Sequence, residues 1–201
     1  MSAQAIFTSG AASEAASRAI ASVSPRSGNV AIGPALPDDI GNLFLWLNDA
    51  QAAQSDAHYQ PVDPLAFKDW LDRHTKAMPA LFVIRSLEPA RAVGFVLFKS
   101  LNPAFRAAEL GVRIGAEQDR GKGHGGAAIA LALDYAWDSL NLRRVWLTVF
   151  AGNNRAIAAY ARAGFREEGV MRQAAFAGGH WHDVVMMAAL NPLETGGYSQ
   201  R

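Results

Sequence analysis

The sequence predicts a mixed α+β fold with a mostly antiparallel sheet of about seven strands and about four helices. Three observations support this class. The chain has 201 residues and a mass of 21.5 kDa, which suits one ordinary α/β domain with a substantial core. From about residue 28, short apolar runs of strand character alternate with segments of helical periodicity. Two pairs of strand-like runs are separated by only a few residues, as in antiparallel hairpins.

The first half of the chain contains four predicted strands and two predicted helices. Apolar residues from Ile40 to Leu47 follow the i, i+3, i+4, i+7 spacing of an amphipathic helix. The dipeptide Glu88-Pro89 separates two partly β-branched runs, which predicts a hairpin. The segment from Trp46 to Pro64 is polar, and we expect a loop there that faces a substrate. The predicted elements are strands at Val30–Ile32, Ala80–Arg85, Val93–Lys99 and Ala107–Ile114 and helices at Ile40–Leu47 and Leu65–Lys76.

The second half begins with a loop over residues 115–126 that leads into a helix ending near Leu140. Gly164 stands where a helix C-terminus favours positive φ, and it closes the next predicted helix. Gly178-Gly179 is a strong turn signal between the last two strands. The predicted elements are a strand at Arg144–Phe150, a helix at Asn153–Arg162 and strands at Glu168–Ala174 and His180–Leu190.

The composition excludes several classes of protein. Nineteen basic and eighteen acidic residues give a formal charge of +1, which leaves no electrostatic footprint for nucleic acid or an anionic membrane. The chain has no cysteine, so disulfides, thiolate nucleophiles and cysteine-ligated zinc are excluded. No run approaches the roughly 20 apolar residues of a membrane span, and the N-terminus lacks the pattern of a secretory signal. We therefore expect a soluble, cytoplasmic protein.

The ends of the chain differ from its centre. Residues 1–27 are rich in Ala and Ser and are expected to form a flexible leader. The folded domain is expected over residues 28–191, followed by a tail at 192–201. Three tryptophans of the domain are expected in its core, with a homodimer interface as the alternative, namely Trp137, Trp146 and Trp181.

Four glycines within six positions follow a predicted strand and precede a helix, in Arg120-Gly-Lys-Gly-His-Gly-Gly126. Glycine lets successive backbone N–H groups point into one concavity, and a helix N-terminus adds a partial positive charge. Such a loop binds phosphate oxygens, although a tight turn before any helix looks similar. The P-loop pattern fails because Gly123 follows Lys122 where Ser or Thr is needed. A dinucleotide-binding unit is disfavoured because antiparallel strands precede the loop and the next strand ends without an acidic residue.

With these residues the sequence resembles the GNAT superfamily of N-acetyltransferases. The superfamily signature for acetyl-CoA, Arg/Gln-x-x-Gly-x-Gly/Ala, is matched in full by residues 120–125. The segment from Asn153 to Phe165 is similar to a second superfamily run, with Asn, Ala-Ile, Tyr and Gly-Phe in order. Residues 178–184, Gly-Gly-His-Trp-His-Asp-Val, are similar to the closing hairpin of the RimJ/RimL-type branch, which includes ribosomal-protein alanine acetyltransferases.

The resemblance implies a fold and an activity. The fold is the GNAT fold, a twisted sheet that splays between its fourth and fifth strands. The activity is direct transfer of an acetyl group from acetyl-CoA, the co-substrate, to a primary amine in a ternary complex. The amine belongs to a protein N-terminus or to a small molecule. A non-catalytic acyl-CoA-binding module with the same fold is the alternative.

The resemblance also implies roles for individual residues. Tyr160 is expected to protonate the leaving sulfur, with a core aromatic as the alternative, and Asn153 to contact the cofactor, an N-cap role being compatible. Glu109 is expected to accept the proton of the amine, with an ion pair to Arg113 as the alternative. The pyrophosphate nest opens at Gln118, Asp119 or Arg120. The residues implied for acetyl-CoA are Val112, Ile114, Gly115, Arg120, Gly121, Lys122, Gly123, His124, Gly125, Gly126, Asn153 and Tyr160.

Histidines are the remaining candidates. His58 and Tyr59, together with His180 and His182 in the last hairpin, could line the acceptor site, although a histidine in a loop is more often only solvated. No metal is expected, because no second pair with ligand spacing accompanies His180 and His182.

Overall fold

The computed structural model describes residues 26–49, 62–76 and 80–193. The described chain forms two compact units. The first contains the described parts of residues 26–49, 62–97 and 112–131, and the second contains residues 98–111 and 132–193. The expected leader, the loop residues His58 and Tyr59 and most of the expected tail lie outside the described residues.

The first unit is built on antiparallel strands. β1 (Arg26–Ser27) and β2 (Val30–Gly33) form a short hairpin, and β2 pairs with β3 (Leu81–Leu87). β3 pairs in turn with β4 (Ala90–Asn102) across the two-residue turn predicted at Glu88-Pro89. β2 is buried along its whole length, and so are the first six residues of β3. These strands therefore form the core of the unit.

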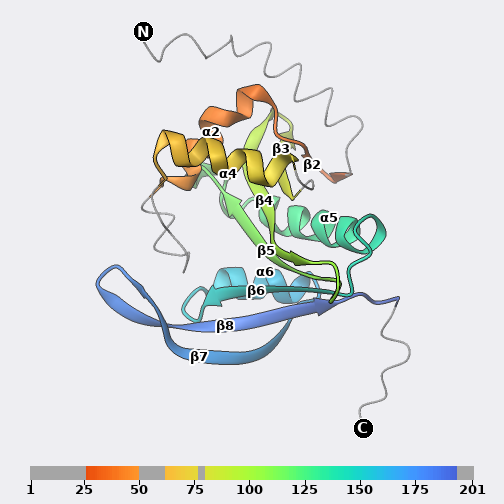
Figure 1. Cartoon of the computed structure of the whole chain (residues 1–201), viewed down its shortest axis with the longest axis vertical. Coiled ribbons are helices and arrows are strands. Elements are labelled where there is room, and N and C mark those ends of the chain that lie inside the picture. The colour runs from red at the N-terminus through yellow and green to blue at the C-terminus, as the bar shows by residue number, and fades with distance from the viewer. Residues whose placement is uncertain (1–25, 50–61, 77–79, 194–201) are drawn as a thin grey trace. The chain divides into compact units, whose positions relative to one another are not determined.

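Two helices of this unit, α2 (Ile40–Leu47) and α4 (Pro64–Lys76), pack on one face of β3 and β4 (Figure 1). Phe44 of α2 meets Phe67 of α4 edge to face, with ring centroids 5.2 Å apart. The shared cluster consists of Leu43, Phe67, Leu81, Val83, Phe95 and Leu97. The amphipathic stripe predicted for Ile40–Leu47 thus buries its central leucine in this cluster.

A buried ion pair fixes the start of α2. The Arg85 guanidinium on β3 donates to the Asp39 carboxylate and, at 3.1 Å, to the carbonyl of Pro34. Asp39 also accepts a bond of 2.8 Å from the Leu36 N–H. Both charged side chains are almost fully buried. Buried charges are retained only when they are paired, so this pair locks the entry to α2 in place.

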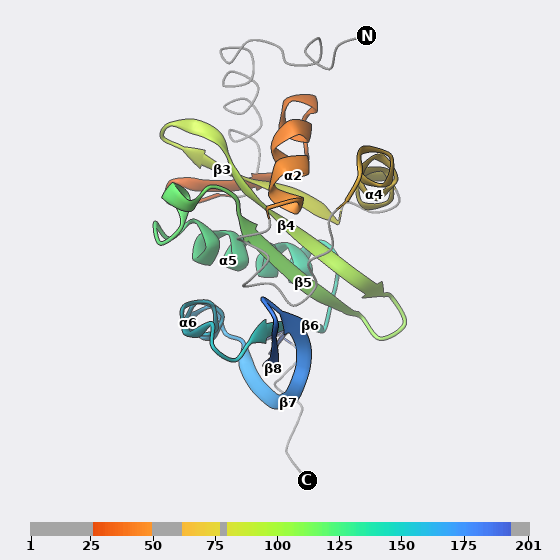
Figure 2. The same cartoon turned by 90° about the vertical axis from the view of Figure 1, so that its left-hand side faces the viewer.

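The second unit contains the parallel strand pair. β5 (Ala107–Ile114) pairs in parallel with β6 (Arg144–Phe150) over Ala107–Glu109 and Arg144–Trp146. β6 is antiparallel to β8 (His180–Leu190), and β8 is antiparallel to β7 (Arg166–Ala177). Figure 2 shows these three strands grouped together. α6 (Asn154–Arg162) connects β6 to β7. Gly178 and Gly179, with φ of 57° and 82°, form the predicted turn between β7 and β8.

These observations confirm the predicted fold class. Hydrogen-bonded neighbours follow the order β1-β2-β3-β4-β5-β6-β8-β7, and only the β5–β6 pair is parallel among the registered pairs of the described residues. Counted from β2, β5 and β6 are the fourth and fifth strands. Their registered pairing covers only the first three residues of each strand, and this is the pair that was expected to splay.

Beyond shifts of a few residues at the ends of strands and helices, three details differ from the sequence predictions. The two-residue strand β1 was not expected. The helix after the glycine loop, α5 (His124–Asp138), begins at His124, so Gly125 and Gly126 belong to its first turn and not to the loop. Trp181 is 62% exposed and therefore not a core residue. It meets Phe176 edge to face on the opposite strand of the β7–β8 hairpin, which keeps both rings at the surface.

Candidate functional site

The end of β5 presents backbone groups on both sides of the strand. The N–H of Gly115 donates to the carbonyl of Val93 on β4 at 2.9 Å. Successive N–H groups of a strand point in opposite directions, so the N–H groups of Ile114 and Val112 point away from β4. Of the three residues expected to offer backbone groups here, Gly115 therefore uses its N–H within the sheet, while Val112 and Ile114 direct theirs outward.

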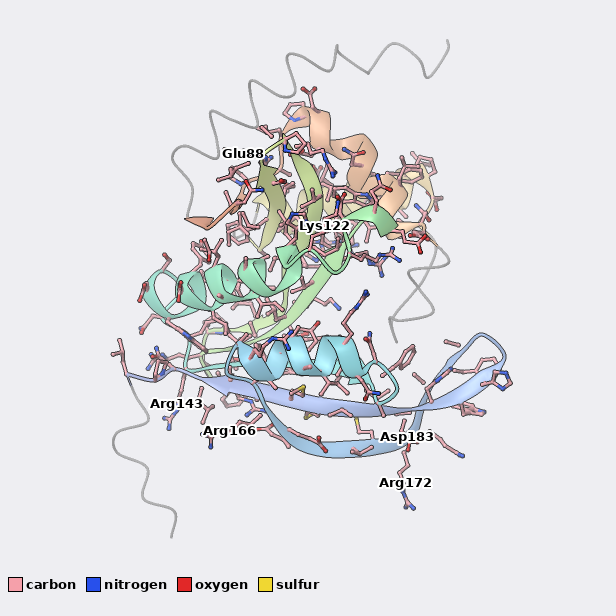
Figure 3. The ribbon with its side chains drawn as sticks, turned by 180° about the vertical axis from the view of Figure 1, so that it is seen from behind. Glu88, Lys122, Arg143, Arg166, Arg172 and Asp183 are labelled. Atoms are coloured by element: carbon pink, nitrogen blue, oxygen red, sulfur yellow. The ribbon has the colours of Figure 1, made fainter. Side chains whose placement is uncertain are left out.

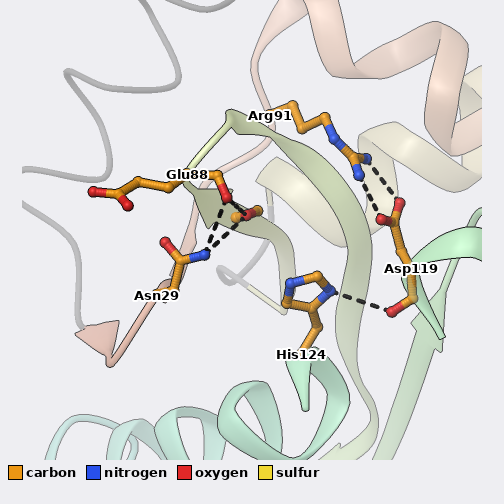
Figure 4. Close-up of polar contacts among 6 residues, drawn as sticks. Asn29, Glu88, Arg91, Asp119 and His124 are labelled. Atoms are coloured by element: carbon orange, nitrogen blue, oxygen red, sulfur yellow. Dashed lines mark hydrogen bonds and ion pairs between the residues drawn. The ribbon is translucent and has the colours of Figure 1, made fainter. Parts of the chain in front are cut away.

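The chain then makes a short 3-10 turn, Glu117–Asp119, whose last residue is anchored firmly. Arg91 on β4 donates two hydrogen bonds to the Asp119 carboxylate, one of them 2.7 Å long (Figure 4). The Asp119 side chain is 1% exposed. These hydrogen bonds hold the pKa of Asp119 below its ordinary value of 3.8, against the opposing effect of burial. The ion pair thus fixes the point from which the glycine loop departs.

Gly121 and Gly123 give the loop its course. Their φ angles are +80° and +85°, a region that favours glycine. The carbonyl of Gly123 accepts the first hydrogen bond of α5, from the N–H of Ala127 at 3.1 Å. The N–H groups of His124, Gly125 and Gly126 therefore open the helix without partners inside it. A Cβ at Gly121, Gly123 or Gly126 would contact nothing in the described chain within 4 Å.

The side chains around this loop take three different roles. The imidazole of His124 is buried, and its Nδ1 lies 3.3 Å from the carbonyl of Asp119. Arg120 turns back to the carbonyl of Gly115 and the carboxylate of Asp49. Lys122 is exposed in the loop ahead of α5 (Figure 3). Among these three side chains, only Lys122 is both exposed to solvent and without a hydrogen bond or ion pair to another described residue.

In the second unit, α6 begins at an N-cap. The side chain of Asn153 accepts a hydrogen bond of 3.2 Å from the N–H of Ala156, so the predicted N-cap role is confirmed. Tyr160 lies two turns further along the helix and is half-buried. Its ring meets Phe165 edge to face, with centroids 5.7 Å apart. The aromatic contact fixes the orientation of the Tyr160 ring.

The other candidates of this unit have partners in the fold. Glu109 forms an ion pair with Lys99 at 3.5 Å, which replaces the alternative pairing with Arg113. The Nε2 of His182 lies 3.0 Å from the carbonyl of Ala177, and its ring stacks on Phe150. His180 is exposed. These two contacts fix the position of the His182 ring.

The described residues define what this arrangement can do. Two positive-φ glycines and the open N-terminus of a 15-residue helix have the backbone geometry and the partial positive charge that suit an anion such as a phosphate. Within residues 26–49, 62–76 and 80–193, no group of three or more acidic or His side chains is placed to hold a metal ion. No helix in those ranges is long and apolar enough to cross a bilayer.

Comparison with known families gives one match that covers most of the chain. The family described as acetyltransferase (GNAT) domain matches residues 29–166. This stretch includes the glycine loop, α5 and α6. It ends at the first residue of β7, so the β7–β8 hairpin lies almost wholly beyond the match.

Individual relatives cover less. A spermidine N(1)-acetyltransferase of Vibrio cholerae is 36% identical over 98 residues, which are 49% of this chain and 56% of that protein. A putative ribosomal N-acetyltransferase, YdaF of Bacillus subtilis, is 35% identical over 97 residues, or 48% and 52% of the two chains. The chain thus spans little more than half the length of these relatives. The crystal structure of a Vibrio cholerae spermidine N-acetyltransferase with CoA and spermine superposes with a TM-score of 0.73 at 25% identity, over 82% of this chain and 96% of that one.

The Arg91–Asp119 pair predicts a pH-dependent loss of stability in Asp119→Asn. The carboxylate has a lowered pKa in the folded protein, so its contribution is present at neutral pH. This contribution decreases once the pH falls below 3.8, the ordinary pKa of the carboxyl group, and it is lost as the pH passes the lower pKa of the folded protein. We expect the variant to lose about 2 kcal/mol of unfolding free energy at neutral pH, with the difference shrinking below about pH 4. Urea unfolding at several pH values measures both.

Asp134→Asn is the matched control, because Asp134 is exposed on α5. It should change the unfolding free energy by less than about 0.5 kcal/mol. An Asp119→Asn variant that loses the same stability in acid as at neutral pH would show that the ion pair is not the source of the effect.

Proposed function

Because the chain belongs to the GNAT acetyltransferase family, we propose that it binds acetyl-CoA and transfers the acetyl group to a primary amine of a small molecule. The observation that carries the cofactor assignment is the glycine loop. Gly121 and Gly123 hold positive φ angles, and the first N–H groups of α5 follow directly. This arrangement fits the pyrophosphate of CoA, because it offers several N–H donors at the positive end of a helix dipole.

The proposed chemistry divides among a few groups. Acetyl-CoA supplies an activated acyl carbon, and attack by a neutral amine forms the C–N bond as the C–S bond breaks. The N–H groups of Val112 and Ile114, which point away from β4, are suited to hold the pantetheine and polarise the acyl carbonyl. We assign Tyr160 to protonate the departing sulfur. Glu109 is the candidate to accept the proton of the amine, directly or through water, and its ion pair with Lys99 uses the carboxylate form that this step requires.

A small amine is the acceptor that the relatives favour. The Vibrio cholerae relative compared above is a spermidine acetyltransferase, and the similar crystal structure is of a spermidine acetyltransferase with CoA and spermine. Another relative is named as a putative ribosomal acetyltransferase, which keeps a protein N-terminus as the second acceptor class. The closing hairpin of the RimJ/RimL-type branch is similar to the β7–β8 hairpin, and that branch includes enzymes that acetylate protein N-termini. Identifying the acceptor would therefore show which branch of the family the chain belongs to.

An amine panel with detection of free CoA tests the acceptor. Spermidine, spermine, an amino sugar and a short peptide with a free N-terminal alanine represent the two classes. We expect turnover on the small amines and little on the peptide. Turnover confined to the peptide would assign the chain to the N-terminal acetyltransferases. Binding of acetyl-CoA without turnover on any amine would instead indicate a non-catalytic acyl-CoA-binding module.

Tyr160→Phe separates the binding of acetyl-CoA from its chemistry. The ring and its contact with Phe165 remain, while the hydroxyl is lost. We expect kcat to fall by about 100-fold, because general acid catalysis typically contributes factors of this size. The Kd of acetyl-CoA, measured by calorimetry, should change little.

Tyr135→Phe on α5 is the matched control, because it removes a hydroxyl from another half-buried tyrosine. Its kcat should equal that of the wild type. If Tyr160→Phe also keeps the wild-type kcat, the assignment of Tyr160 as the general acid is wrong.

A further inference from the structure

The end of α2 and the end of β5 are joined by several contacts within the first unit. The Nη1 of Arg113 donates to the carbonyl of Trp46 at 2.6 Å. The indole of Trp46 lies against Gly115 so closely that a Cβ there would be 2.0 Å from its Nε1. Arg120 completes the set, because its Nη2 reaches both the Gly115 carbonyl and the Asp49 carboxylate just beyond α2.

The contacts of Arg120 are unexpected for the first residue of a phosphate-binding signature. Its Nη2 lies 2.8 Å from the carbonyl of Gly115 and 3.3 Å from the carboxylate of Asp49. Its Nε lies 3.5 Å from the carbonyl of Ile114. The side chain is 25% exposed. The guanidinium thus faces the last carbonyls of β5, and the nearby carboxylate offsets its charge.

Both polar backbone groups of Gly115 are held by hydrogen bonds. The N–H of the same residue is bonded to Val93, so the two peptide groups that flank Gly115 are fixed by Val93 on one side and by Arg120 on the other. The first of these peptide groups joins Gly115 to Ile114. This peptide group directly follows the one that carries the Ile114 N–H, so a displacement of the end of β5 would also shift this N–H, which points away from β4.

We propose that Arg120 is a positioning residue for the acetyl transfer and not a ligand of the CoA pyrophosphate. It bridges Gly115 to Asp49 and so holds the end of β5 in the geometry that presents the Ile114 N–H. The inference rests on the proposed function. In this division, the backbone N–H groups of the glycine loop and of α5 bind the pyrophosphate. The Arg120 side chain aligns the acyl group.

Two variants separate positioning from phosphate binding. Arg120→Met keeps the apolar stem and removes every donor, while Asp49→Asn removes the carboxylate and leaves the arginine charge intact. A positioning role predicts that kcat falls by about tenfold in both, because small misplacements of reacting groups are costly in rate. The Kd of CoA should stay within about twofold of the wild-type value, because a positioning residue does not touch CoA. A twofold change in Kd corresponds to about 0.4 kcal/mol of binding free energy.

A phosphate-ligand role predicts the opposite pattern. Arg120→Met would then weaken CoA binding by tenfold or more with kcat at saturation retained, and Asp49→Asn would bind CoA as tightly as the wild type or more tightly. The double variant adds a further readout. Its loss in kcat should be clearly smaller than the product of the two single losses if the two side chains share one bridge, whereas fully additive losses in kcat would overturn the proposal.

Hydrogen exchange of residues 112–116 gives a readout that does not depend on turnover. Both variants should exchange these amides faster than the wild type, and to a similar extent, while the β6 amides stay unchanged. Wild-type exchange in both variants would overturn the proposal even if no amine is acetylated. If Arg120→Met does not fold, Arg120→Lys replaces it, because lysine keeps the charge but lacks the Nε donor that faces the Ile114 carbonyl and the planar shape of the guanidinium. A failure of the proposed function would show separately, as an absence of wild-type turnover on every amine.

Discussion

The ion pair between Arg91 and Asp119 is the interaction on which the candidate cofactor site depends. Its carboxylate is almost completely buried, so it is stable only with the two hydrogen bonds from Arg91. The pair ties the start of the glycine loop to β4, a strand of the core. From this fixed point Gly121 and Gly123 turn the chain with positive φ and deliver the open N-terminus of α5 to the surface. A loop with no such anchor would lose entropy each time it bound a phosphate.

The strands and helices were largely predictable because local patterns determine them. Ala107–Ile114 and Arg144–Phe150 have the predicted bounds, since each is a run of mainly apolar or β-branched residues between polar or turn residues. The position of Trp181 was not predictable, because exposure depends on what covers β7 and β8 and not on the residue itself. The start of α5 was misplaced for a related reason. Gly125 and Gly126 read as loop residues, yet a helix nucleated by the following alanines and leucines includes them in its first turn.

The candidate site was also predictable only in part. Its backbone part consists of glycines and a helix N-terminus that are consecutive in the sequence, so it could be predicted from that sequence. The side-chain part could not, because its partners are remote in sequence. Asp119 is held by Arg91, 28 residues earlier, and Arg120 by Asp49, 71 residues earlier. No spacing rule connects such pairs. The burial of His124 is equally invisible in the sequence, since a histidine beside four glycines suggests a ligand.

The most direct test of the account compares CoA binding to Gly123→Asp and Gly123→Asn by calorimetry. Asparagine tolerates positive φ and is the same size as aspartate, so the two variants share the strain at this position and differ in charge. If the loop holds the CoA pyrophosphate, Gly123→Asn binds CoA measurably and Gly123→Asp binds it at least about tenfold more weakly, with the difference reduced at high salt. Equal affinity for CoA in the two variants would contradict the assignment of the loop.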